Sequence, residues 1–145
     1  MPPAYVLDTS VKVAAFRSGR GASRQLLLDA LAARFDLLLS VPLLLEYEAV
    51  LTRTDQLNAF GIGRREVERV LDDIASIARQ VRLAYRWRPQ LSDANDDMVL
   101  ETAVNGNADA VVTFNRTDFL ALSERFDCRV ILPRIALREL RGKTT

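Results

Sequence analysis

Histidine is absent from the 145-residue sequence, and cysteine occurs once, as Cys128. Without histidine the chain has no Ser-His or Cys-His nucleophile, no histidine-ligated zinc and no imidazole acid–base catalyst. A single cysteine can form neither an internal disulfide nor a thiolate metal site, which suits a reducing cytoplasm. If the protein is an enzyme, its reactive groups are therefore expected to be carboxylates, which prefer hard cations such as Mg²⁺ or Mn²⁺.

Long apolar runs are missing as well. No run approaches the roughly 18–20 apolar residues of a membrane span, and the N-terminus lacks the basic and then apolar pattern of a signal peptide. We therefore expect a cytoplasmic protein with no membrane association. Because no repeat or domain boundary is visible, residues 1–145 are expected to form a single domain with a buried core.

Lysine is scarce: Lys12 and Lys143 are the only two, and all other basic residues are arginines. Arginine suits phosphate because its planar guanidinium donates two hydrogen bonds at once. A general preference for arginine codons would produce the same composition, so this observation alone favours neither explanation.

Short apolar runs alternate with helical patterns along the chain. Strands are predicted at residues 4–7, 36–41, 81–85, 109–114 and 129–133. Helices are predicted at residues 21–35, 42–53, 64–81, from the acidic cluster to about 106, from about 118, and at 134–140. The first of these has its apolar stripe at Leu27, Leu31 and Ala32, with Leu28 and Phe35 beside it. This alternation predicts an α/β fold with a mainly parallel sheet covered on both faces, in which ligands bind at the carboxyl ends of the strands.

Acidic and amide side chains follow two of these strands. Asp8 comes directly after residues 4–7, and Asn115 and Asp118 come just after 109–114. Each has a purely structural alternative, since Asp8 or Asp118 could cap a helix and Asn115 could be a turn residue. Their recurrence at the same predicted edge favours a functional site.

The stretch LSDANDDMVL (91–100) concentrates three aspartates at the start of a helix. Asp93 precedes the helix and is the expected cap, because aspartate is favoured there. Asp97 points further round the helix, together with Glu101. Asp96 lies on the apolar stripe that is formed by Val99, Leu100 and Ala103. A carboxylate turned towards a core is costly unless something compensates its charge, and a bound cation would do so.

Two glutamates, Glu46 and Glu48, lie on the otherwise apolar helix that opens with Pro42. Both have apolar neighbours at helical spacing, so periodicity does not choose between them. One of the two is expected to be an ordinary solvated residue.

Taken in order, these blocks resemble the PIN domain family, and in particular the VapC-like toxins of toxin–antitoxin pairs. The resemblance rests on YVLDTSV (5–11), VPLLLEYEAVL (41–51), DDMVLETA (96–103), ADAVVTFNRTDF (108–119) and CRVILPRIAL (128–137). It favours Glu46 over Glu48, and it selects Asp96 within the acidic cluster. One departure is that Asn115 stands where many PIN domains have a fourth acid, which leaves open the number of bound ions and whether Asn115 or Asp118 fills that position.

The resemblance implies a three-layer α/β/α sandwich and a metal-dependent endoribonuclease that uses Mg²⁺ or Mn²⁺. Asp8 and Asp96 would be the principal metal ligands, and Glu46 and Asp118 would complete the catalytic site directly or through water. The expected supporting residues are Thr9, Ser10, Asn115, Asp93 and Asp97.

The resemblance also implies partners, namely an RNA substrate, a cognate antitoxin and a second copy of the chain in a homodimer or higher oligomer. Arginines near the first and fourth motifs are candidate phosphate contacts: Arg17, Arg20, Arg24 and Arg116. Trp87 could stack on a base, or it could anchor a loop.

Of three alternative functions, the first fits the sequence and the other two do not. A non-catalytic PIN-like module would bind RNA or protein without cutting. A haloacid-dehalogenase-like phosphatase needs a second aspartate two residues after the first, where this chain has Ser10. A receiver-like domain needs a pair of acids near the first strand, which the sequence lacks.

Overall fold

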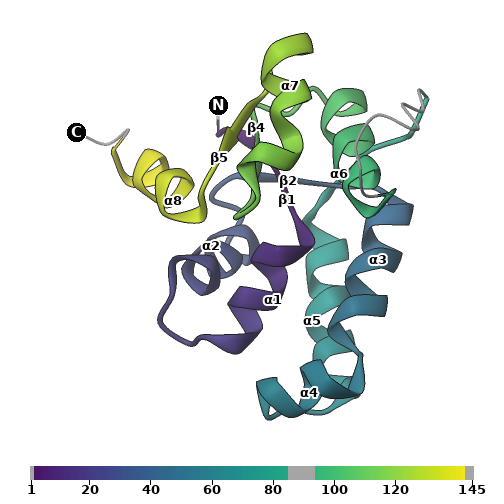
Figure 1. The fold of residues 1–145 in the computed structure, drawn as a ribbon. Helices are drawn as coiled ribbons and strands as arrows, with labels where there is room; N and C mark the ends of the chain where they lie inside the picture. Colours follow the sequence, from purple (N-terminus) through teal and green to yellow (C-terminus); the bar gives the residue numbers. More distant parts are fainter. Residues whose placement is uncertain (1, 85–93, 143–145) are drawn as a thin grey trace.

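The structure is a computed structural model that describes residues 2–84 and 94–142 (Figure 1). The predictions made above for Trp87 and Asp93 therefore lie outside the described residues. Among the described helices, none is both long enough and apolar enough to cross a membrane.

Five parallel strands form one sheet in the order β3-β2-β1-β4-β5. They are β1 (Ala4–Leu7), β2 (Asp36–Leu39), β3 (Arg79–Gln80), β4 (Ala110–Val112) and β5 (Arg129–Ile131). All four side chains of the central strand β1 are buried, as expected for a sheet that is covered on both faces. The predicted α/β class and parallel sheet are confirmed.

Helices flank this sheet and complete an α/β/α sandwich (Figure 1). The α-helices are α1 (Thr9–Arg17), α2 (Ala22–Leu31), α3 (Val41–Leu51), α4 (Thr54–Phe60), α5 (Arg64–Ile77), α6 (Ala94–Asn105), α7 (Leu120–Arg125) and α8 (Pro133–Gly142), and η1 (Arg116–Phe119) is a 3-10 helix. Helix α6 packs across β1, β2 and β4, while α2 contacts both α1 and α8. The short helix α4 was not predicted from the sequence.

The third strand was predicted in the wrong place. Instead of residues 81–85, β3 consists of Arg79 and Gln80, which pair with Leu38 and Leu39 of β2. Both β3 side chains are exposed, so this short edge strand carries no apolar signal in the sequence. Val81 follows the strand, and its amide nitrogen still donates to the Leu39 carbonyl at 2.8 Å.

The predicted helix at 21–35 is too long, and its stripe is misplaced. Helix α2 ends at Leu31, and Ala33 then adopts a left-handed conformation with φ 59°. Leu27 and Phe35 are buried as predicted, but Leu26 and Ala30 complete the buried face of α2 in place of Leu31 and Ala32, and Leu28 is 49% exposed. The physical reason is tertiary: α2 is placed between α1 and α8, so the face that meets these helices is the one that is buried.

Gly106 follows α6 where the chain passes close to β2. A Cβ atom there would lie 2.8 Å from Val81 Cγ2, 2.9 Å from Leu38 Cδ1 and 3.0 Å from the Thr102 carbonyl oxygen. The two side chains could shift, but the carbonyl belongs to the helix backbone. Only glycine therefore fits this crossing without displacement of its neighbours.

We expect Gly106→Ala to lower the free energy of unfolding by about 1–3 kcal/mol, the usual cost of overpacking. Urea denaturation measures this change. Gly19→Ala is the matched control, because a Cβ at Gly19 meets nothing within 4 Å, and it should change stability by less than about 0.5 kcal/mol. Equal losses in the two variants would contradict the steric explanation.

Candidate active site

Asp8 leaves the sheet at the carboxyl end of the central strand. The register pairs Leu7 of β1 with Val112 of β4, so Asp8 and Thr113 follow their strands side by side. The Asp8 Oδ2 atom accepts hydrogen bonds from Thr113 Oγ1 at 2.7 Å and from Ser10 Oγ at 2.8 Å. Asp8 occupies the N-cap position of α1, but its side chain makes no capping hydrogen bond. Its carboxylate is thus held by the site and is not used to start the helix.

The electrostatic state of Asp8 reflects opposing influences. Burial raises the pKa of this carboxyl, because the side chain is 5% exposed and its charged form is poorly solvated. Hydrogen bonds from Thr113, Ser10 and the Thr9 backbone lower the pKa, and the negative charge of Asp118 raises it. A nearby cation would favour the ionised form, so Asp8 has the electrostatic character of a cation ligand.

Glu46 lies on α3, the helix that follows the carboxyl end of β2. Ser40 caps this helix by accepting from the Leu43 amide at 3.4 Å, and its hydroxyl is 2.7 Å from Thr102 Oγ1 of α6. The fully buried Tyr47 donates its hydroxyl hydrogen bond to the Leu7 carbonyl, directly before Asp8. Glu46 is half-buried beside these anchors.

Glu48 lies two residues further along α3 and is exposed. The difference in burial separates the two glutamates, which periodicity could not do. It is the contacts of α3 with α1, α5 and α6 that decide which part of the helix surface is covered.

Helix α6 carries more buried acid than its periodicity predicts. Asp96 is 9% exposed, as its place on the apolar stripe predicts. Asp97 and Glu101, however, are 2% and 0% exposed, so the expectation that they point away from the buried stripe is wrong. Contacts with three strands and with α3 and η1 cover the helix on several sides. Glu101 was missed as a candidate, although its i,i+4 spacing from Asp97 places both on one face.

Thr113, Asn115 and Asp118 form the part of the edge that follows β4. The Thr113 hydroxyl, which donates to Asp8, also accepts from the Asn115 amide at 2.9 Å. The Asp118 amide donates to the Asn115 carbonyl at 3.0 Å, and the buried Phe119 anchors η1. The Asn115 and Asp118 side chains are both exposed at this edge. Thr113 was not among the predicted residues, although it follows β4 as Asp8 follows β1.

The residues at this edge have suitable donor atoms for a metal ion, but their side chains are not already gathered around one point. Their donors are carboxylate, hydroxyl and amide oxygens, which are the ligands that Mg²⁺ and Mn²⁺ prefer. Across residues 2–84 and 94–142, however, no three acidic or cysteine side chains lie close enough together to hold an ion. The chemistry of the edge therefore suits a hard cation, while the described positions form no ready-made ligand set.

The four arginines predicted to contact RNA have different surroundings. Arg17 donates to Gln56 Oε1 through Nε at 3.2 Å and through a terminal nitrogen at 2.8 Å. Arg24 Nε donates to the Ala15 carbonyl at 2.5 Å. Arg20 and Arg116 are exposed. Arg17 and Arg24 thus have structural contacts in addition to any role with a ligand.

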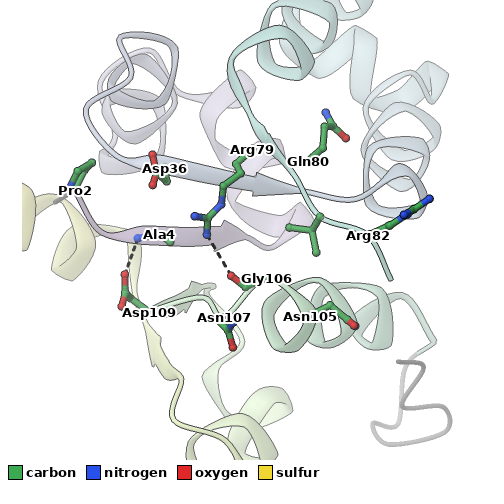
Figure 2. A pocket seen from close by; sticks show the side chains of 11 residues that line it. Pro2, Ala4, Asp36, Arg79, Gln80, Arg82, Asn105, Gly106, Asn107 and Asp109 are labelled. Atoms are coloured by element: carbon green, nitrogen blue, oxygen red, sulfur yellow. Dashed lines mark hydrogen bonds between the residues drawn. The ribbon is translucent and has the colours of Figure 1, made fainter. Parts of the chain in front are cut away.

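A cavity of about 590 Å³ opens at the opposite, amino edge of the sheet (Figure 2). Two of its charged side chains bind backbone groups: Asp109 Oδ2 accepts from the Ala4 amide at 2.7 Å, and Arg79 donates to the Gly106 carbonyl at 3.2 Å. None of the predicted site residues lines this cavity. Its polar groups support the fold, and the candidate site remains at the carboxyl edge.

Lys12 is buried close to the site, one turn after Asp8 on α1. Its side chain is 0% exposed, and its Nζ atom has no hydrogen-bond partner in the part of the chain that the structure describes. That nitrogen lies 5.1 Å from the centroid of the Tyr47 ring. Burial lowers the pKa of this amine from 10.5 to about 7. This burial could not be predicted from the sequence, because a lysine between apolar residues of a helix ordinarily reaches solvent.

A known protein family matches the part of the chain that contains most of the candidate site residues. The family model described as "PIN domain" matches residues 4–117. This segment includes Asp8, Glu46, Asp96 and Asn115, and it ends directly before Asp118. No match was found among curated proteins or among solved structures.

Lys12 makes the stability of the protein depend on pH. Below about pH 7 the amine is protonated in both states, so the folded protein carries the full cost of a buried charge. Above that pH the unfolded state binds more protons, and the free energy of unfolding rises as pH increases towards the ordinary pKa of lysine. From pH 6.5 to 8 we expect a rise of about 1 kcal/mol in wild type.

Lys12→Met should be more stable at pH 7 and should lose most of this rise, as measured by urea denaturation across that range. The range stays below the ordinary pKa of cysteine, so the raised pKa of Cys128, about 11, does not contribute. Arg65→Met on the exposed surface is the control and should keep the wild-type slope. The same slope in Lys12→Met and wild type would rule out a buried, uncompensated amine.

Proposed function

The chain belongs to the PIN domain family, and from this membership we propose that it is a metal-dependent endoribonuclease and the toxin of a type II, VapC-like toxin–antitoxin pair. PIN domains are generally nucleases that hydrolyse phosphodiester bonds, and they typically use a divalent metal ion. Cleavage of RNA, dependence on Mg²⁺ or Mn²⁺ and the toxin role are the parts that we add.

The observation that carries the proposal is the environment of Asp8. A buried carboxylate at the carboxyl end of the central strand is held by two hydroxyl donors on the same oxygen, Oδ2. In an open parallel sheet this edge is where ligands bind. Such an arrangement orients a carboxylate towards a ligand and limits its other motions, which is what a site for phosphodiester chemistry requires.

Asp8 and Asp96 would be the principal ligands of the ion, with Glu46 and Asp118 completing the site directly or through water. When bound, the ion supplies a Lewis acid that polarises the phosphodiester and lowers the pKa of water. Thr113 and Ser10 orient Asp8. Asn115, whose side chain is exposed, would orient a ligand or a water molecule.

A non-catalytic PIN module that binds RNA or protein is the second candidate. It is favoured by Asn115 at the position of a fourth acid and by the lack of a ready-made metal cluster among the described residues. Mg²⁺ or Mn²⁺ titration distinguishes the two functions, because only the nuclease needs the ion.

Exposed apolar side chains near the carboxyl edge support the proposal of protein partners. Val41 and Leu45 lie one turn apart at the start of α3 and are 63% and 59% exposed. Phe114 and Leu120, which follow β4, are 49% and 50% exposed. An antitoxin or a second copy of the chain that covered these four side chains would also cover the site. We propose that the protein acts in the cytoplasm, where its RNA substrate is found.

The paired glutamates of α3 give a matched test. We expect Glu46→Gln to reduce metal-dependent cleavage of RNA by about 100-fold or more, because a group that acts at the reacting atoms is lost. Glu48→Gln makes the same chemical change on the exposed side of the same helix and should keep wild-type activity. Initial rates on a mixed RNA pool with Mg²⁺ measure both. Equal activity of Glu46→Gln and Glu48→Gln would remove Glu46 from the site.

A further inference from the structure

Helix α8 has one face made of arginine. Arg134, Arg138 and Arg141 follow one another at spacings of four and three residues, so they lie on one side of the helix. All three are exposed. Together with Leu137 and Gly142 they line a hollow of about 440 Å³. These three residues are called the α8 arginine face below.

Other residues of α8 make contacts that hold the helix against the rest of the protein. Ala136 is fully buried, and the helix packs against α2. Glu139 forms an ion pair with Arg129 of β5 and accepts a hydrogen bond from the Tyr5 hydroxyl at 3.0 Å. The one acid on α8 is thus used on the inner side, away from the arginine face.

Positive charge is concentrated at this end of the chain. From Arg129 to Lys143 there are five basic residues and one acidic residue, a net charge of +4, whereas the whole chain has a net charge of +1. Within the described residues, Arg134 and Arg138 have no ion-pair partner. Two like charges at i,i+4 repel each other, and a bound polyanion would relieve this repulsion.

The position of α8 connects this charge with the carboxyl edge of the sheet, where Asp8, Glu46, Asp96 and Asp118 would form the site and which is called the acidic edge from here on. The registers align Leu7 with Val112 and Val112 with Ile131, so the chain leaves β5 at the same level at which Asp8 leaves β1. Two strand spacings, about 10 Å, separate these points. Helix α8 starts directly after β5 and runs outward from the sheet (Figure 1). From Arg134 to Arg141 the face extends about 10 Å along the helix.

We propose that the α8 arginine face binds the phosphate backbone of the RNA strand whose scissile bond lies at the acidic edge. This inference rests on the proposed function, since it assigns the surface to the same substrate. The carboxylates of the edge repel phosphate, so binding of RNA needs compensating positive charge nearby. Guanidinium groups match phosphate bidentately. The face lies beyond residues 4–117, the part of the chain matched by the family model.

The test is equilibrium binding of a short fluorescent single-stranded RNA in EDTA, followed by anisotropy over a range of salt concentrations. The variant is the double substitution Arg134→Gln and Arg138→Gln. Arg65→Gln with Arg69→Gln is the matched control, because it removes the same charge at the same spacing from an exposed face of α5. Arg134→Lys with Arg138→Lys keeps the charge. Circular dichroism and urea denaturation establish that all variants are folded.

We expect the α8 glutamine variant to bind RNA more weakly whatever its sequence. Its slope of log affinity against log salt should be shallower by about 1.4, which is about 0.7 for each of two phosphate contacts. The lysine variant should keep most of the slope, and the α5 variant should keep the wild-type slope. An unchanged slope in the α8 variant, or an equal loss in the α5 variant, would overturn the proposal. Weaker binding to polyglutamate with an unchanged RNA slope would assign the face to an acidic protein and would overturn it as well.

The same experiment separates this inference from the proposed nuclease. If wild type cuts RNA with Mg²⁺ and the α8 slope is unchanged, only the assignment of α8 fails. If wild type binds RNA without cutting it and the slope falls as expected, the α8 surface stands and the nuclease fails. If wild type neither binds nor cuts RNA, both are wrong.

Discussion

The hydrogen bond from Thr113 Oγ1 to Asp8 Oδ2 joins the ends of the two central strands. It depends on the parallel register of β1 and β4, which brings the residues after Leu7 and Val112 together. The same hydroxyl accepts from the Asn115 amide and so sets the start of the segment that carries Asp118. On the other side, Tyr47 binds the carbonyl directly before Asp8 and fixes α3, the helix of Glu46. The edge is therefore arranged around one carboxylate.

Several charged side chains are buried around the candidate site. Asp8, Asp96, Asp97 and Glu101 are buried acids, and Lys12 is a buried amine whose Nζ atom has no hydrogen-bond partner among the described residues. A buried charge without a partner opposes folding, so an apolar residue in place of Lys12 would stabilise the protein more. Such departures from the best packing are expected at functional sites. Positive charge gathers separately on α8, beyond the acidic edge.

The sequence predicted those parts of the fold that depend on local pattern. Apolar runs located β1, β2, β4 and β5, because strands of a sheet that is covered on both faces are rich in apolar residues. All side chains of β1 and β4 are buried, whereas in the edge strand β5 only Ile131 is buried and Arg129 is exposed. The edge strand β3 could not be placed, because its two side chains are exposed and its pairing with β2 is a tertiary contact. The buried stripe of α2 was misplaced for a similar reason, since α1 and α8 decide which side of α2 is covered.

The residues of the candidate site could likewise be predicted where they depend on local pattern, but not where they depend on tertiary contacts. Asp8 was found because it directly follows a strand, and Asp96 because it lies on an apolar stripe. Thr113 was missed because its importance comes from the register with Asp8, which no single segment reveals. The burial of Glu101 and the isolation of Lys12 were missed because both depend on neighbours that are distant in sequence.

The acidic edge is proposed to be a metal-dependent nuclease site, and the most direct test compares wild type with Asp96→Asn. Both proteins, first shown to be folded, would be given the same RNA pool with Mg²⁺, with Mn²⁺ and with EDTA. Asp55→Asn, which changes an exposed acid of α4, is the control. We expect wild type and the control to cleave RNA only when the ion is present, and Asp96→Asn not to cleave it. Equal cleavage by all three proteins, or cleavage that persists in EDTA, would contradict it.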